Sequence, residues 1–134
     1  MMRCVGQRQT PIEQTTAFLV RKVGQRYRFN NRKLPGSPDL SNQACGWAIF
    51  VNGCFWHGHK NCLKTKGGKG PRIPSIRRKF WSEKIQGNRQ RDARKCRQLR
   101  HFGLRVLIIW ECQLRNVDKV EERLRKMLPH SSKG

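Results

Sequence analysis

The sequence predicts an α/β fold, a single domain with a central mixed sheet flanked by helices. Two apolar runs of strand length, at 47–51 (WAIFV) and 104–110 (LRVLIIW), are typical of buried strands. The basic segment 77–102 between them carries apolar residues at helical spacing and stops at Gly103. A helix that joins two strands of one sheet implies at least one parallel strand pair.

The other elements follow from shorter signals. Thr10, Pro11 and Glu13 supply a capping residue, a proline suited to the first helical position and a capping-box acid. We therefore expect a helix over 11–23, and the whole chain should follow the order α–β–β–β–α–β–α. The remaining predicted features are short strands at 27–29 and 38–40, a polar gap at 41–43 and a final amphipathic helix at 117–128.

Length and charge narrow the class of protein. A chain of 134 residues is one domain's worth, so we expect one domain over 1–134. Within it we expect a short arm at 1–9, a mobile basic loop at about 64–75 and a flexible tail at 129–134. The 30 Lys and Arg residues against 8 Asp and Glu give a net charge of +22. This excess indicates a polyanionic partner, either nucleic acid or an anionic membrane surface.

Hydropathy separates a folded chain from a disordered one. The mean hydropathy of −0.81 is low, but 36% of the residues are hydrophobic and they fall in periodic blocks. We therefore expect a folded domain with a very basic surface. No run of eighteen apolar residues and no secretory signal is present, so the expected location is intracellular.

Acidic residues are scarce, so each is a candidate ligand for a hard cation. Asp39 enters a short predicted strand and precedes the strand at 47–51 by a hairpin's length. Two adjacent strands would place it beside Val51 or Asn52. That arrangement would suit Mg²⁺ held by one carboxylate, one backbone carbonyl and a substrate phosphate. The simpler alternative is that Pro38 and Asp39 only form a turn.

A second cluster has the residue types that bind soft metals. Cys54, His57, His59 and Cys62 fall within nine residues, and the last two have the spacing of half a zinc site. Spacing alone leaves open which of the four bind and whether zinc is present. Candidates for the other half are Asp92 and Cys112. A histidine left out of the metal site would be available as a general base.

Two further features indicate contact with nucleic acid. Phe55 and Trp56 are adjacent large aromatics, which can wedge between base steps or pack over the metal site. The long predicted helix and the loop before it carry a basic stretch, which is either a solvated helix face or a phosphate-binding surface. Its leading members are Arg72, Arg77, Arg78, Lys79 and Lys84.

Taken together, these residues resemble the very-short-patch-repair (Vsr) DNA mismatch endonucleases over nearly the whole chain. The pairing of GCFWH with a later WEC is highly specific for that family. The matching segments are TPIE at 10–13, LPGSPDL at 34–40, GCFWHGH at 53–59 with Cys62, FWSEKIQGNRQRD at 80–92 and GLRVLIIWEC at 103–112.

The resemblance implies a fold of the PD-(D/E)xK nuclease type and a Mg²⁺-dependent enzyme. Such an enzyme nicks one strand 5′ to the T of T:G mismatches, which arise when 5-methylcytosine deaminates. Asp39 would be the metal-binding carboxylate and Val51 would add its backbone carbonyl. His57 would activate water, and Glu13 would orient metal-bound waters. Asn52 stands where the family often carries His or Asp, which implies a slower reaction.

The resemblance also assigns a structural zinc site and a wedge. His59, Cys62, Asp92 and Cys112 match the zinc ligands, which leaves Cys54 without a metal. The wedge that opens the duplex would consist of Phe55, Trp56 and Met2. The tail before Met2 that clasps DNA in the family is short here, which implies lower affinity or specificity.

The implied partner is double-stranded DNA with a T:G mismatch, and mismatch-repair proteins are further candidate partners. A nicking enzyme needs only a monomer, and the implied location is the cytoplasm, at the nucleoid. Two alternatives stay open. A nuclease of the same fold linked to restriction–modification would cut perfect duplex, whereas a zinc-stabilised DNA-binding module would bind DNA without Mg²⁺-dependent cleavage.

Overall fold

A computed structural model describes residues 10–54 and 77–128 of the chain. The elements appear in the predicted order, with one short 3₁₀ helix added after the last strand. They are α1 (Pro11–Lys22), β1 (Arg28–Phe29), β2 (Leu40–Asn42), β3 (Trp47–Asn52), α2 (Arg78–His101), β4 (Arg105–Trp110), η3 (Glu111–Arg115) and α3 (Val117–Met127). The expected arm at 1–9, the loop at about 64–75 and the tail at 129–134 lie outside the described residues.

The four strands form one mixed sheet in the order β1-β2-β3-β4. β1 pairs with β2 and β2 with β3 in antiparallel fashion, whereas β3 and β4 are parallel. The prediction of a parallel pair is thus confirmed. The predicted polar gap at 41–43 is wrong in part, because Ser41 and Asn42 belong to β2 and pair with Ala48 and Trp47 of β3. Strand pairing overrides the polarity of these two residues.

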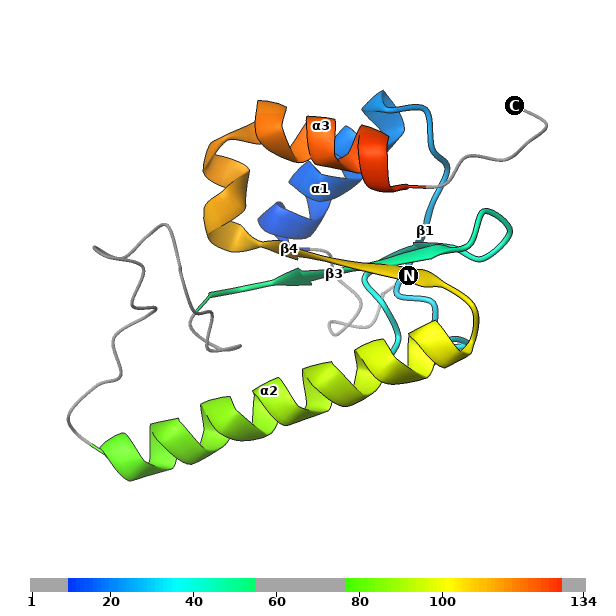
Figure 1. Cartoon of the computed structure of the whole chain (residues 1–134). Helices are drawn as coiled ribbons and strands as arrows, with labels where there is room; N and C mark the ends of the chain where they lie inside the picture. The colour runs from blue at the N-terminus through cyan, green and yellow to red at the C-terminus, as the bar shows by residue number, and fades with distance from the viewer. Residues whose placement is uncertain (1–9, 55–76, 129–134) are drawn as a thin grey trace, which may run out of the picture.

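Helices cover both faces of the sheet (Figure 1). α1 and α3 lie on one face, where Leu40, Ile49 and Ile109 of the sheet enter the main hydrophobic core. α2 runs along the other face, where Cys96 and Leu99 pack in a second cluster with sheet residues. β3 is therefore buried at every position, which explains its unbroken apolar sequence.

The long helix α2 buries few of its residues. Ile85, Cys96 and Leu99 are its buried positions. Phe80, an apolar residue in its first turn, is 44% exposed. The first turns of α2 therefore offer their side chains to solvent or to a partner.

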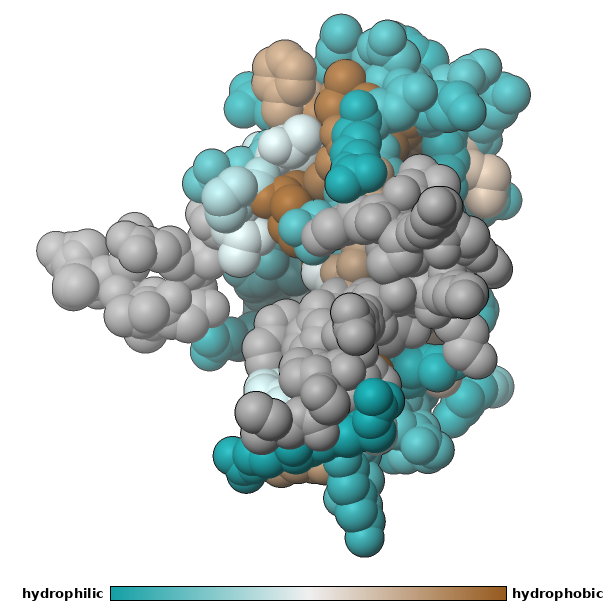
Figure 2. All heavy atoms as spheres, turned by 90° about the vertical axis from the view of Figure 1, so that its left-hand side faces the viewer, coloured by the Kyte–Doolittle hydropathy of each residue, from teal (hydrophilic) through white to brown (hydrophobic). Residues whose placement is uncertain are grey.

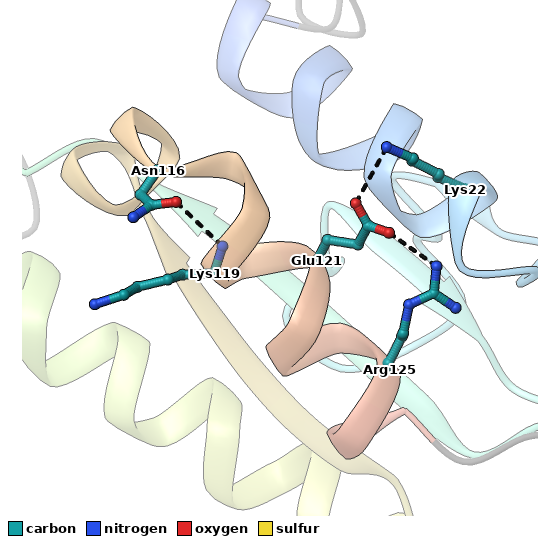
Figure 3. A network of polar contacts seen from close by, with 5 residues as sticks. All are labelled: Lys22, Asn116, Lys119, Glu121 and Arg125. Atoms are coloured by element: carbon teal, nitrogen blue, oxygen red, sulfur yellow. Dashed lines mark hydrogen bonds and ion pairs between the residues drawn. The ribbon is translucent and has the colours of Figure 1, made fainter.

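A polar network ties α1 to α3 (Figure 3). Glu121 of α3 lies 3.3 Å from Lys22 Nζ of α1 and 2.8 Å from Arg125 Nη2 one turn further along α3. The hydrogen bonds from Arg125 and then Lys22 lower the pKa of Glu121. Asn116 caps α3, since its Oδ1 accepts a hydrogen bond from Lys119 N at 3.3 Å. The ion pair between Glu121 and Lys22 thus links the two helices on the same face of the sheet.

In the parts of the chain at 10–54 and 77–128, no helix has both the length and the apolar character needed to cross a membrane.

Candidate active site

The site begins with the carboxylate of Asp39, immediately before β2. Its Oδ2 accepts a hydrogen bond from the Val51 backbone N–H at 2.7 Å. Its own backbone carbonyl accepts a hydrogen bond from Asn30 N at 3.0 Å. The prediction that adjacent strands bring Asp39 beside Val51 is confirmed. Because β3 and the residue after β1 both bond to it, Asp39 is more than a member of a turn.

Glu13 meets Asp39 from the first turn of α1. Thr10 caps this helix, and its Oγ1 accepts a hydrogen bond from Glu13 N at 3.3 Å. Partial burial raises the pKa of Glu13, and the charge of Asp39 and a hydrogen bond to it raise that pKa further. Hydrogen bonds from Thr10 act in the opposite direction. Two carboxyl groups therefore share one location in a chain of net charge +22.

This pair suits a hard divalent cation. Close carboxylates repel one another, and a cation between them favours the ionised form of both. Mg²⁺ is commonly held by one or two carboxylates, with waters and substrate phosphate completing its shell. The described residues contain no group of three or more His, Cys, Asp or Glu side chains that could hold a metal. A Mg²⁺ ion here would therefore depend on backbone, water or substrate oxygens for its remaining ligands.

Asn52 ends β3 and is buried, in register with Trp110 of β4. The predicted roles of Asn52 beside the water and of the Val51 carbonyl on the metal stay predictions. The predicted base, His57, lies outside the described residues.

The residues predicted to bind zinc fall in two groups. His59 and Cys62 lie outside the described residues. Cys112, at the start of η3, is buried and packs against Cys54, which follows β3. Asp92 lies on α2, close enough to Cys96 for its charge to contribute to the raised pKa of that thiol, after the larger effect of burial. The structure thus brings Cys54 to Cys112, although the resemblance leaves Cys54 without a metal.

Glu111 holds the beginning of the GCFWH segment in place. Its Oε1 accepts a hydrogen bond from Cys54 N at 3.4 Å. The carboxylate therefore connects the end of β4 to Cys54, the residue before the aromatic pair in the sequence. Sequence reasoning missed this role. The available sequence signal was Glu111 itself, the acid of the WEC motif, which directly follows a strand parallel to β3.

Exposed cations gather where α2 begins. Arg77, Arg78, Lys79 and Lys84 are all exposed, and the first turn of α2 holds no acidic residue. Figure 2, turned so that this end of α2 faces the viewer, shows hydrophilic side chains along its lower edge. The predicted DNA-contacting residues Met2, Phe55, Trp56 and Arg72 lie outside the described residues.

An aromatic pair accompanies these cations, and sequence reasoning did not single it out. The guanidinium of Arg77 lies 4.5 Å from the centre of the Phe80 ring. Phe80 and Trp81 meet edge to face, with ring centres 5.1 Å apart. Their position beside each other at the start of a basic helix was the available signal.

Comparison with known proteins bears on this site. Residues 1–64 match the family model described as DNA mismatch endonuclease Vsr. The chain is 40% identical to the DNA mismatch endonuclease Vsr of Escherichia coli, over 90% of this chain and 73% of that protein. It is 37% identical to the type II nicking enzyme V.XorIIP of Xanthomonas oryzae, over 98% of this chain and 91% of that protein. It is 38% identical to the type II nicking enzyme V.NmeAIP of Neisseria meningitidis, over 82% and 76% of the two chains.

A mixed sheet between helices, an acidic pair and these relatives define the class, a nicking endonuclease that acts on DNA. Within that class, the chain belongs to the Vsr family of DNA mismatch endonucleases.

Proposed function

We propose that the protein is a Mg²⁺-dependent endonuclease that nicks one strand 5′ to the T of a T:G mismatch in double-stranded DNA. The observation that carries this proposal is the Glu13–Asp39 carboxyl pair beside Val51 in a chain of the Vsr family. The E. coli relative is named a DNA mismatch endonuclease, which favours the mismatch as substrate. The proposed setting is chromosomal DNA in the cytoplasm.

The proposed chemistry is hydrolysis of one phosphodiester bond. Bound Mg²⁺ would polarise the scissile phosphate and stabilise the charge that develops on it. Asp39 would hold the ion, with the Val51 carbonyl as a further ligand. Glu13 would orient water, and His57 would take a proton from the attacking water. Asn52 would add only a neutral side chain beside that water.

Duplex recognition would use the cations and aromatics at the start of α2 and in the GCFWH segment. Positive side chains at a helix N-terminus oppose the helix dipole. Arg77, Arg78 and Lys79 occupy that position without an acid in the first turn. A DNA phosphate bound there would be attracted both by these cations and by the positive end of the helix dipole. Phe55, Trp56 and Met2 would open the duplex at the mismatch, where unstacking is easiest.

A strand-resolved cleavage assay with Mg²⁺ tests this function. One duplex carries a central T:G within a cytosine-methylation site, and its control carries T:A. We expect nicking of the T:G duplex alone, 5′ to the T. No nicking of either duplex, with tight binding of both, would leave only a DNA-binding module.

A nuclease linked to restriction–modification is the second candidate, because two of the relatives are named type II nicking enzymes. The same assay separates it from the first. Equal cutting of the T:G and T:A duplexes would favour this second candidate and overturn mismatch specificity.

We further propose a structural Zn²⁺ ion held by His59, Cys62, Cys112 and a fourth ligand. Asp92 is the fourth ligand that the family resemblance implies, and Cys54 is the one that packing against Cys112 favours. Elemental analysis of purified Asp92→Asn and Cys54→Ser separates the two. The variant that loses zinc carries the ligand, and full zinc content in Cys112→Ser would overturn the site.

A further inference from the structure

We propose that a polar pocket beside β1 and β2, separate from the Glu13–Asp39 pair, binds a phosphate group. The pocket has a volume of about 240 Å³. Its lining holds two arginines and no acidic residue. The lining residues are Arg26, Tyr27, Arg28, Asn31, Ser41, Asn42 and Gln43.

One lining residue, Ser41, carries a buried hydroxyl to which no described residue is hydrogen-bonded. Ser41 is 1% exposed. Within the part of the chain that the structure describes, its Oγ makes no hydrogen bond. Buried polar side-chain atoms nearly always have a protein or water partner, so a ligand or water in this pocket would supply the partner that the Ser41 hydroxyl needs. Ser41 is in register with Arg28 of β1, so the two side chains lie on the same face of the sheet.

The charges of the pocket select an anion. Arg26 and Arg28 are exposed, and neither makes an ion pair with a carboxylate in the described residues. Arginine presents a planar set of donors that matches phosphate oxygens. Two guanidinium groups and a hydroxyl, without a nearby acid in the lining, would therefore bind phosphate and repel cations.

Hydrogen bonds hold the pocket wall in shape before any ligand binds. Asn42 Nδ2 donates to the Arg26 carbonyl at 3.0 Å, and Asn42 Oδ1 accepts from Cys45 N at 2.9 Å. These bonds fasten the segment before β1 to the turn between β2 and β3. On the opposite side, Asn31 Oδ1 accepts from Lys33 N at 3.0 Å. A preformed wall lowers the ordering cost of binding.

The size of the pocket favours a phosphate group over a whole nucleotide. Pockets that enclose drug-sized ligands span roughly 300–1,000 Å³. The group could come from the backbone of bound DNA or from free phosphate. Only the first source rests on the proposed function, and the two sources are separated by experiment.

The first experiment titrates inorganic phosphate into the ¹⁵N-labelled full chain, with chloride as the ionic-strength control. We expect saturable shifts of amide signals in β1 and β2. Arg28→Gln should weaken phosphate binding by about tenfold, because the variant loses one charge-assisted hydrogen bond to the phosphate. Ser41→Ala should weaken it without lowering Tm, because the hydroxyl makes no hydrogen bond to the residues that the structure describes. Arg115→Gln, on η3 after the strand at the opposite sheet edge, is the matched control and should bind phosphate as the wild type does.

The second experiment identifies the source by duplex binding at several salt concentrations. If the pocket binds a backbone phosphate, Arg28→Gln should reduce the slope of log K against log [salt] by about 1. An unchanged slope together with weakened phosphate binding would assign the pocket to free phosphate. Equal phosphate binding by the wild type, Arg28→Gln and Ser41→Ala would overturn the proposal that this pocket binds phosphate. A failure of the cleavage assay would leave the phosphate titration intact, so the two proposals fail separately.

Discussion

At the scale of single residues, the candidate site depends on one carboxylate that meets a strand on one side and a helix on the other. Asp39 accepts from Val51 N and is joined by Glu13 from α1. Val51 belongs to β3 and Glu13 to α1, and both elements are held by their own packing. A substitution at Asp39 can therefore remove its charge while β3 and α1 stay in place. This property makes isosteric substitutions informative.

Asp39→Asn should abolish nicking while leaving fold and DNA binding intact. The amide oxygen of Asn can still accept from Val51 N, whereas the charge that would hold Mg²⁺ is lost. We expect a fall in the nicking rate of about a thousandfold or more, since a metal ion supplies several kcal/mol of transition-state stabilisation. The control is Asp118→Asn, on the exposed first turn of α3. Nicking at the wild-type rate by Asp39→Asn would remove Asp39 from the metal site.

Glu13→Gln should make the metal-free protein more stable at neutral pH. Burial and Asp39 raise the pKa of Glu13 above 4.5 in the folded state. The folded state therefore holds the proton more tightly than the unfolded state does. Stability from this group is present below the unfolded pKa and is lost as pH rises through the folded pKa. Glutamine stays neutral and avoids this loss.

The measurement is urea unfolding in EDTA at pH 4 and pH 7. The gain of Glu13→Gln over the wild type should be larger at pH 7. Glu122→Gln, an exposed acid of α3, is the control. A gain of equal size at both pH values would contradict a raised pKa for Glu13.

At the scale of elements, the turn before β2 decides where Asp39 lies. Gly36 in this turn has φ of +76°, and a Cβ there would lie 2.7 Å from Lys95 Cγ of α2. The stem of Lys95 thus packs directly on the turn, and its ammonium lies 5.9 Å from the centre of the Phe50 ring. This contact holds the LPGSPD segment (34–39) on the face of the sheet that α2 covers.

Gly36→Ala should therefore destabilise the protein more than Gly24→Ala does. Both glycines have positive φ, but a Cβ at Gly24 would meet nothing within 4 Å. Strain of the left-handed backbone should cost roughly 1–2 kcal/mol in each variant. Gly36→Ala adds displacement of Lys95. The free energies of unfolding from urea titration measure both, and equal losses would show that Lys95 moves aside freely.

At the scale of the whole molecule, the charge of +22 governs how the protein meets DNA. Neutralised phosphates release counterions, so each cation in contact with DNA adds to the salt dependence of binding. Glu121 and Glu122, which form ion pairs with basic side chains, lie on α3. The cations at the start of α2 are exposed and have no acid in their turn.

Arg78→Gln and Lys79→Gln should each weaken duplex binding and reduce the slope of log K against log [salt] by about 1. The effect should be the same on T:G and T:A duplexes, because phosphate contacts do not read sequence. Lys126→Gln, whose ammonium pairs with Glu122, is the control for loss of one charge. Wild-type slopes in both α2 variants would exclude this end of α2 from the DNA interface.

Much of the fold was predictable because its strongest signals are local. The runs 47–51 and 104–110 became β3 and β4, and the helix-start signature at Thr10 became the cap of α1. Patterns failed where a neighbour in space decides the outcome. Ser41 and Asn42 lie in a strand because β3 pairs with them. Phe80 is exposed, whereas Cys96 and Leu99, in the later turns of α2, pack with sheet residues.

The sequence by itself determined the elements, the basic character and the family, because periodicity, charge and motifs are properties of the chain. Only the tertiary structure decided that Glu13 meets Asp39, that Cys54 packs on Cys112 and that the hydroxyl of Ser41 is buried with no hydrogen bond to a described residue. Each of these facts joins residues from different elements or depends on burial. Such contacts arise from the packing of helices on a sheet, which no local pattern encodes.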